Sequence, residues 1–317
     1  DNIMPLGAFK AALMGTAGVS TGGNGYTMAG SESGGKVDKI EKFAFASDGN
    51  ATDVGDVTAV RSACSGTNSS THGYIFGGKT NGHSHIDVIE KFSFSSGGDS
   101  ADVGDLTGAT GYAAGHQSSA SGYRSSGLTP AVGEGSTTVN IIDKWSYSSD
   151  ANATDVGDIT VARFGATGVS SSASGYTAGG QSESANTNII DKFSLSSDGN
   201  STDVGDLTHI LSYTGAGAQS SASGYNGGGS RTGTTYDIIE KWSFSSDADA
   251  TDVGDLTVPR SETCGQSSDT HGYASGGDNG GTRQDVIDKW AFASDGDASD
   301  VGNLTTARMQ LASCSDK

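Results

Sequence analysis

Basic residues, cysteine and long apolar runs are all scarce in this chain, and each scarcity excludes a class of protein. Only 18 Lys and Arg stand against 37 Asp and Glu, and the resulting formal charge of −19 disfavours binding to nucleic acid or to an anionic membrane. No run approaches the roughly 18 apolar residues of a membrane-spanning helix, and the first 20 residues lack the basic start and long apolar core of a secretory signal. We therefore expect no nucleic-acid partner and no membrane insertion.

Cysteine is limited to Cys64, Cys264 and Cys314, so at most one disulfide could form. All three lie in the Gly-, Ser- and Ala-rich part of an internal repeat, where a small apolar side chain fits. We expect buried thiols and no disulfide scaffold.

Glycine and internal repetition are abundant. The dipeptide Gly-Tyr occurs at 25, 73, 122, 175, 224 and 272, and Asp-Val-Gly at 53, 102, 155, 203, 252 and 300. A repeat of 48 to 53 residues predicts a β-propeller of four-stranded blades. The sequence thus predicts one all-β domain, a six-bladed propeller over residues 15–317, after an N-terminal extension (1–14) where Pro5 favours a short helix.

Each repeat predicts four strands. The first is rich in Gly, Ser and Ala, as at 165–174, and suits the crowded axis. The third carries two large apolar side chains on one face, such as Phe43 and Phe45, which we expect to pack between blades. The fourth contains Asp-Val-Gly-Asp-Leu, whose Val and Leu supply the opposing surface. The second begins with Gly-Tyr and ends at a glycine expected to have a positive φ: Gly30, Gly78, Gly127, Gly180, Gly229 and Gly277.

The two ends of the chain predict ring closure. Residues 304–315 repeat the first-strand pattern without the rest of a blade, and residues 15–26 begin a repeat that lacks a preceding Asp-Val-Gly. We expect the C-terminal strand to join the N-terminal blade and remove an open sheet edge. The alternative is a fragment of a longer chain, in which a further blade follows.

Loop length varies in one part of the repeat. The spacing from the third-strand Lys to Asp-Val-Gly is 11 residues in all six repeats, whereas the loop between the second and third strands changes in length and composition. Loops that tolerate such change lie on the surface and often carry function. These loops supply the candidate binding residues, which are His83, His85, Leu128, Glu134, Arg231, Tyr236, Asn279 and Arg283.

The repeat resembles kelch repeats, because a Gly-Gly pair ends one strand and Leu-Thr-x-x-Arg leads into a new blade. The matching residues are Gly77-Gly78, Gly179-Gly180, Gly228-Gly229 and Gly276-Gly277, with Arg61, Arg163, Arg260 and Arg308. Thr110 and Leu211 replace the arginine in two repeats, and the fourth-strand Trp of kelch units is absent. The resemblance is therefore to a divergent kelch-like class.

The sequence IIDKFSLSSDGNSTDVGD at 189–206 also resembles repeats in predicted virion structural and tail-fibre proteins of marine tailed phages, especially cyanophages. This resemblance covers residues 15–315. It implies a virion or extracellular location, with other assembly proteins or a host-surface glycan or protein as partners. The expected role is attachment or virion decoration.

No single asymmetric set of residues indicates catalysis, so we expect a non-enzymatic protein, with a glycan-cleaving enzyme as a less favoured alternative. The turn at 196–203 resembles the Asp box of sialidases, which is itself a structural turn. Asp48, Asn50 and Asp53 could offer oxygen ligands to Ca²⁺, but hydrogen-bonded Asx turns are favoured. The pair His83 and His85 has no nearby Cys to complete a metal site. No cofactor is expected.

Two further expectations concern charged and aromatic residues. Neighbours such as Asp191 and Lys192 recur in every repeat and are expected to form structural ion pairs. Outside the strand pairs and the Gly-Tyr tyrosines, only Tyr236 lies squarely in a variable loop, so a broad aromatic platform for sugars is not expected. The other unassigned aromatic residues are Phe9, Phe76, Tyr112, Phe164 and Tyr213.

Overall fold

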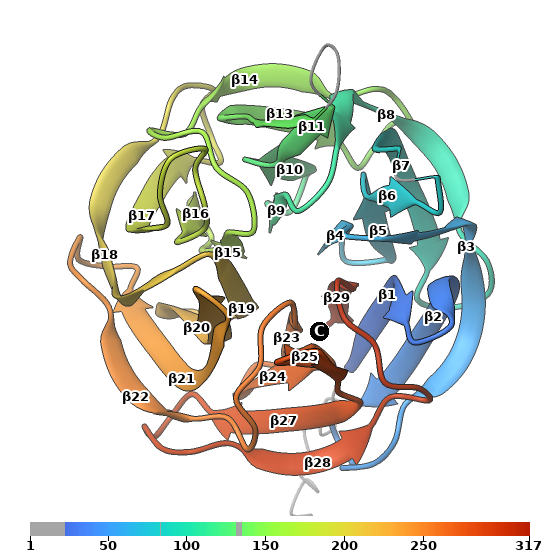
Figure 1. The fold of residues 1–317 in the computed structure, drawn as a ribbon. Coiled ribbons are helices and arrows are strands. Elements are labelled where there is room, and N and C mark those ends of the chain that lie inside the picture. Colours follow the sequence, from blue (N-terminus) through green and yellow to red (C-terminus); the bar gives the residue numbers. More distant parts are fainter. Residues whose placement is uncertain (1–22, 83, 131–134) are drawn as a thin grey trace, which may run out of the picture.

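The computed structural model describes residues 23–82, 84–130 and 135–317, which form a six-bladed β-propeller (Figure 1). Within these ranges the chain is all strand and connection, and no helix long and apolar enough to cross a membrane occurs. The expected extension and its helix at Pro5 lie outside the described residues.

Each blade is an antiparallel sheet of four strands, which follow one another from the axis to the rim. From the axis outward, blade 1 consists of β29 (Ala312–Asp316), β1 (Asn24–Glu32), β2 (Gly35–Ala44) and β3 (Thr52–Ser62), and blade 2 of β4 (Ser65–Asn68), β5 (His72–Phe76), β7 (Ile86–Ser93) and β8 (Ala101–Thr110). In the same order, blade 3 consists of β9 (Ala114–Gln117), β10 (Ser121–Ser125), β13 (Ile141–Ser146) and β14 (Thr154–Asp158), and blade 4 of β15 (Thr167–Ser170), β16 (Ser174–Ala178), β17 (Thr187–Ser194) and β18 (Thr202–Leu211). Blade 5 consists of β19 (Tyr213–Gln219), β20 (Ser223–Arg231), β21 (Thr234–Ser243) and β22 (Thr251–Asp255), and blade 6 of β23 (Cys264–Ser267), β24 (His271–Ser275), β27 (Val286–Ala291) and β28 (Ser299–Asn303).

Short strands occur between the second and third strands of three blades. They are β6 (Lys79–Thr80), which adds to β3, and the hairpins β11 (Leu128–Pro130) with β12 (Ser136–Thr138) and β25 (Asp278–Asn279) with β26 (Thr282–Arg283).

The expected ring closure is confirmed. Strand β29 pairs antiparallel with β1, with Tyr26 opposite Cys314, so the C-terminal strand is the innermost strand of the N-terminal blade. The free edge that β1 would otherwise expose is thereby covered. All three cysteines are buried and free.

The repeated glycines occupy the places expected of them. All six glycines have a positive φ, between 103° and 139°. Four of them follow the end of the second strand, whereas Gly30 and Gly229 lie within the longer strands β1 and β20. The glycine of each Gly-Tyr lies under the large third-strand side chain of its own blade: a Cβ on Gly175 would lie 2.4 Å from the Phe193 ring. Only glycine fits there.

Aromatic packing between blades is also confirmed. In each blade the third-strand pair packs against the Gly-Tyr tyrosine and the Ile of the preceding blade; Trp242 and Phe244, for example, pack on Tyr176 and Ile190. Phe244 stacks on Tyr176 with ring centroids 4.8 Å apart. Val204 and Leu207 of the fourth strand complete this cluster. Burying such a side chain contributes roughly 1.5–3 kcal/mol.

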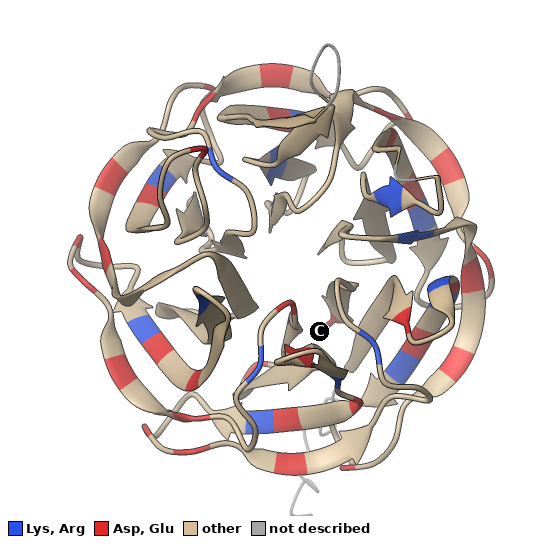
Figure 2. Cartoon of the chain, viewed as in Figure 1, with Lys and Arg blue, Asp and Glu red and all other residues tan. Residues whose placement is uncertain are grey.

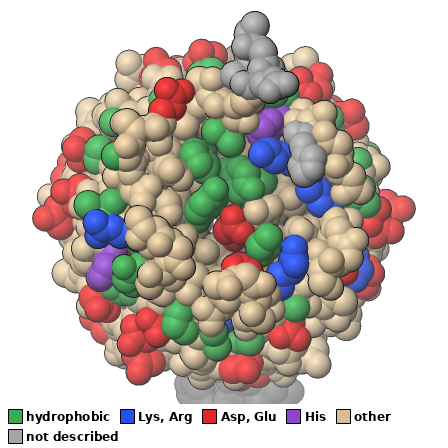
Figure 3. All heavy atoms as spheres, in the orientation of Figure 1, with side chains coloured by type: hydrophobic (Ala, Val, Ile, Leu, Met, Phe, Trp, Pro, Cys, Tyr) green, Lys and Arg blue, Asp and Glu red, His purple; other side chains and the backbone are tan. Residues whose placement is uncertain are grey.

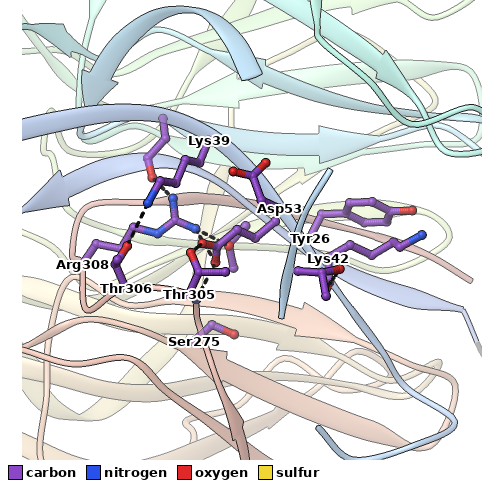
Figure 4. A network of polar contacts seen from close by, with 12 residues as sticks. Tyr26, Lys39, Lys42, Asp53, Ser275, Thr305, Thr306 and Arg308 are labelled. Atoms are coloured by element: carbon purple, nitrogen blue, oxygen red, sulfur yellow. Dashed lines mark hydrogen bonds and ion pairs between the residues drawn. The ribbon is translucent and has the colours of Figure 1, made fainter. Parts of the chain in front are cut away.

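The expected ion pairing of adjacent residues such as Asp191 and Lys192 is wrong, although both residues form structural pairs. Neighbours on a strand point to opposite faces. Asp191 pairs with fully buried Arg163 at 2.8 Å, whereas Lys192 reaches Asp247 of the next blade at 2.8 Å. Figure 4 shows the equivalent network around Arg308, with Thr305 beside it. Arg308 pairs with buried Glu41 of blade 1 at 2.7 Å, and the Thr305 hydroxyl also donates to Glu41.

The cross-blade lysine pairs follow the repeat closely. Five third-strand lysines reach an Asp in the turn of the following blade at 2.6–2.9 Å, and for Lys42 the corresponding position holds Gly97. Figure 2 shows the wider result, a rim where acidic residues recur on every outer strand. Most of the net negative charge therefore belongs to the repeat itself.

Candidate functional site

The two faces of the ring carry different connections. One face, which we call the hairpin face, bears the second-to-third-strand hairpins and the loops that lead from one blade to the next (Figure 1). The opposite face bears the short turns within each blade, whose sequences repeat closely. Departures from sixfold repetition therefore collect on the hairpin face.

A backbone ring surrounds the axis where it opens on the hairpin face. The N–H of Ala63 donates to the Gln310 carbonyl, that of Tyr112 to the Ala63 carbonyl and that of Gly165 to the Tyr112 carbonyl, at 2.8–2.9 Å. Gln310 donates in turn to the Glu262 carbonyl. These five residues have left-handed φ values of 54–65°. Non-glycine residues rarely adopt this conformation, which is often found at functional sites.

At blade 5 the residue that donates to this backbone ring is displaced by one position along the chain. Here Thr214 donates to the Gly165 carbonyl at 2.9 Å, and Tyr213 precedes it. The Asp-Val-Gly to Gly-Tyr interval is 21 residues before blade 5, against 20 elsewhere. This longer connection brings an additional tyrosine to the axial opening.

Three aromatic rings form a cluster at the opening. Tyr112, Phe164 and Tyr213 contact one another edge to face, with ring centroids 5.6–5.9 Å apart. Such contacts stabilise aromatic clusters beyond simple burial. All three side chains are only partly buried, and Figure 3 shows a hydrophobic patch at the centre of this face, beside acidic side chains.

The carboxyl group of Glu262 and the side-chain amide of Gln310 also lie at the axial opening. The Gln310 amide donates to Glu262 Oε1 at 3.1 Å and to the Tyr112 hydroxyl at 2.9 Å. Burial raises the pKa of Glu262, and Asp278 raises it further despite the hydrogen bond from Gln310. Burial likewise raises the pKa of Tyr213, with an added contribution from Glu262.

Two cavities meet at Tyr213 and Glu262. An axial channel of about 170 Å³ is lined by the inner strands, and Tyr112 and Gln310 also line it. A surface groove of about 610 Å³ passes between the connections of blades 4, 5 and 6. Its polar lining includes Gln181, Asn186, Ser212, Ser230, Thr232, Thr235, Ser261 and Asp278.

The loop residues expected to bind are only partly brought together. His83 and Glu134 lie outside the described residues. His85 is buried, which lowers its pKa to about 4, with Lys79 and Lys36 lowering it further. Leu128 is partly buried in β11, where it pairs with Thr138 and Gly111.

The remaining four residues lie on blades 5 and 6. Arg231 is exposed at the end of β20. Asn279 accepts a hydrogen bond from Thr235 at 3.0 Å, and Arg283 donates to Ser31 of blade 1 at 3.3 Å. Tyr236 is not in a free loop, because it lies in β21 and packs partly buried against His209, 5.3 Å away. None of the four lines the groove, although their hairpins enclose it.

Sequence reasoning missed the cluster of Tyr112, Phe164, Tyr213, Glu262 and Gln310. The expectation that, of the unassigned aromatic residues, only Tyr236 lies squarely in a variable loop gave no indication that three of the others meet at the axis. One signal was available: the second residue after the repeated arginine position is of five different types in the six repeats, as Ala63, Tyr112, Gly165, Tyr213, Glu262 and Gln310.

The residues considered for calcium have protein partners. Asp53 accepts from the N–H of Gly55 at 3.3 Å, which is the favoured Asx turn. Asp48 pairs with Lys289, and Asn50 accepts from the Asn303 N–H at 3.0 Å, both on blade 6. In the described part of the chain no three His, Cys, Asp or Glu side chains gather as a metal site would require.

Comparisons with known proteins leave the family open. No protein-family model matches the chain, and no curated protein matches it.

Proposed function

We propose that this protein is a non-catalytic binding module of a virion or another extracellular assembly, and that its hairpin face attaches to a host surface or a neighbouring protein. The observation that carries the proposal is the concentration of irregular residues on one face of an otherwise regular ring. The location rests on the resemblance of the repeat to phage structural and tail-fibre proteins. The kelch-like pattern is in accord with a binding role.

A blocking experiment tests which face makes contact. Ser184 on the hairpin face and Ser172 in a turn on the opposite face are both exposed, and the three native cysteines are buried. Each serine is changed to cysteine, as Ser184→Cys and Ser172→Cys, and coupled to a maleimide–polyethylene glycol chain. Retention is measured on intact host cells and on isolated native particles. We expect the Ser184 conjugate to lose about tenfold or more in retention, with the Ser172 conjugate unchanged.

Equal retention of the two conjugates would contradict the proposal. Retention on particles but not on cells would favour a purely structural or decoration role. Antibody labelling of native particles provides a second test, because a distal position supports attachment and an embedded one supports scaffolding.

Glycan cleavage is a second candidate, favoured by one observation. Glu262 and Asp278 line the same groove, and the pKa of Glu262 is raised. Glycosidases use a pair of carboxyl groups in one site, of which the general acid has a raised pKa. Release of reducing ends from host polysaccharide, abolished by Glu262→Gln and by Asp278→Asn, would establish this activity in place of simple binding.

A further inference from the structure

We propose that the groove between the blade 4, 5 and 6 connections, ending at Tyr213 and Glu262 beside the axis, binds a neutral oligosaccharide. This inference rests on the proposed binding role of the hairpin face and names the ligand. The groove volume of about 610 Å³ lies within the usual range for small-ligand sites, about 300–1,000 Å³.

The groove offers hydrogen-bonding groups suited to hydroxyls. The side-chain amides of Gln181 and Asn186 line it and make no hydrogen bond to any other described residue. An amide carries both donors and acceptors, and a sugar hydroxyl requires both. Thr232 adds a hydroxyl, and Asp278 and Glu262 add acceptors.

Tyr213 provides the apolar surface that a sugar ring requires. The face of a pyranose ring presents C–H groups, which pack on the electron-rich face of an aromatic ring. Edge-to-face contacts with Phe164 and Tyr112 hold the Tyr213 ring in place. A rigid aromatic group loses little conformational entropy on binding, so Tyr213 is expected to dominate the affinity.

Charge selects a neutral ligand. The groove lining contains Glu262 and Asp278 but no Lys or Arg among the described residues. Arg283 does not line the groove, although its charge lowers the pKa of Glu262. Sulfated, phosphorylated and carboxylated chains are therefore repelled. An apolar peptide is disfavoured, because the groove lining apart from Tyr213 consists of polar residues and glycine.

Calorimetric titration with defined hexasaccharides tests the proposal. The neutral probes are maltohexaose, cellohexaose, laminarihexaose, mannohexaose, xylohexaose and chitohexaose, and the anionic probes are a carrageenan hexasaccharide and hexagalacturonate. We expect at least one neutral probe to bind with a Kd below about 1 mM and the anionic probes to bind more weakly. Failure of all neutral probes, or preference for an anionic one, would overturn the inference.

Variants locate the binding to the groove. Tyr213→Ala is expected to weaken binding about tenfold or more, and the double variant Gln181→Ala with Asn186→Ala about threefold to tenfold. The double variant changes two groups without internal partners, so it preserves folding. Tyr236→Ala is the matched control, a partly buried tyrosine of blade 5 that does not line the groove. Equal loss in Tyr236→Ala, or unchanged binding in the double variant, would contradict the assignment.

Competition separates this inference from the broader proposal. If the binding hexasaccharide displaces the protein from host cells, both stand. If the protein adsorbs to cells through the hairpin face and no hexasaccharide binds it or displaces it, the groove assignment fails and the binding role remains. If a hexasaccharide binds in the groove but the protein does not adsorb to cells or particles, the sugar site stands and the attachment role fails.

Discussion

At the scale of single residues, the side chains that differ from the repeat lie at the proposed binding site and in strained backbone conformations. Glycines of the repeat allow close packing, as Gly175 does beneath Phe193. At the axial opening, by contrast, Tyr112, Glu262 and Gln310 occupy left-handed positions where glycine would be less strained, as Gly165 shows. The side chains there contribute contacts that glycine could not, namely the aromatic cluster and the bridge from Gln310 to Glu262.

His116 is a second residue that departs from the repeat. It is buried on the inner strand β9, where Nδ1 donates to the Val169 carbonyl at 3.1 Å and Nε2 accepts from the Ser125 hydroxyl at 2.7 Å. Burial lowers the pKa of His116 to about 4. The neutral form is therefore strongly favoured in the folded protein.

We predict that His116 makes stability depend on pH. The unfolded chain binds the proton near its ordinary pKa of about 6.5, so stability is complete above that pH and decreases as the pH falls towards the folded value of about 4. Between about pH 7.5 and pH 5, the free energy of unfolding should fall by about 2 kcal/mol from this residue. Denaturant unfolding across this range measures the effect.

The variant His116→Gln should remove that part of the decrease, whatever its stability at neutral pH. His209→Gln, on the rim strand β18, serves as the control. An undiminished pH dependence in His116→Gln would show that other groups are responsible.

At the scale of elements, strand alternation and the position of each strand in its blade decide what each charge does. Asp191 and Lys192 are adjacent in β17, yet the first is fully buried beside Arg163 and the second lies at the partly exposed rim. Removing one partner of a buried pair leaves an uncompensated charge, whereas an exposed pair contributes little.

We predict opposite results for two neighbouring substitutions. Asp191→Asn should lower the free energy of unfolding by about 3–5 kcal/mol, because Arg163 stays buried without its counter-ion. Lys192→Met should change it by about 1 kcal/mol or less, because its partner Asp247 remains solvated. Chemical denaturation of both variants provides the measurement, and similar losses in the two would refute this assignment of buried and exposed pairs.

In the two repeats that lack the repeated arginine, a residue of another strand takes over its role. Thr110, at the end of β8, and Leu211, at the end of β18, stand at that position just before blades 3 and 5. In blade 3 the buried Asp143 is bound instead by Arg124 from β10 at 2.8 Å, and in blade 5 Glu240 accepts from Asn226 of β20 at 3.1 Å. The acid of the third strand thus keeps a partner in every blade.

At the scale of the whole molecule, the propeller is held by interactions that run around the axis. Near the face opposite the hairpin face, six backbone N–H groups form a circle of hydrogen bonds, in which each donates to a side chain of the next inner strand. The Asn68 N–H donates to Gln117, the series continues from blade to blade as far as Ser315, and the Ser315 N–H donates to the side chain of Asn68. This circle closes only because β29 is present. The ring is therefore expected to behave as one cooperative unit.

We predict that deleting residues 312–317, which removes β29, will lower the melting temperature by about 5 °C or more, corresponding to about 3 kcal/mol or more for a chain of this size. The exposed edge of β1 should also cause self-association. Differential scanning calorimetry and analytical ultracentrifugation provide the measurements. Deletion of the exposed Lys317 alone is the control, and a monomeric truncated protein of unchanged stability would contradict the importance of closure.

The sequence by itself determined the architecture, because each blade, apart from the closing strand β29 of blade 1, is built from residues close together in the chain. The period, the aromatic pairs, the turn glycines and the unmatched ends together predicted six blades and their closure. The candidate site was predicted only as a face and a set of hairpins. Within those hairpins, Thr232 and Asp278 line the groove, whereas their neighbours Arg231 and Asn279 do not.

Only the tertiary structure decided the composition of the axial opening. Tyr112, Phe164, Tyr213, Glu262 and Gln310 come from different connections, each separated from the next by about one repeat of sequence. A side chain in one connection has no local signal that indicates its neighbours across the axis. Closing the ring converts five unrelated departures from a repeat into one surface, and that surface carries the proposed binding site.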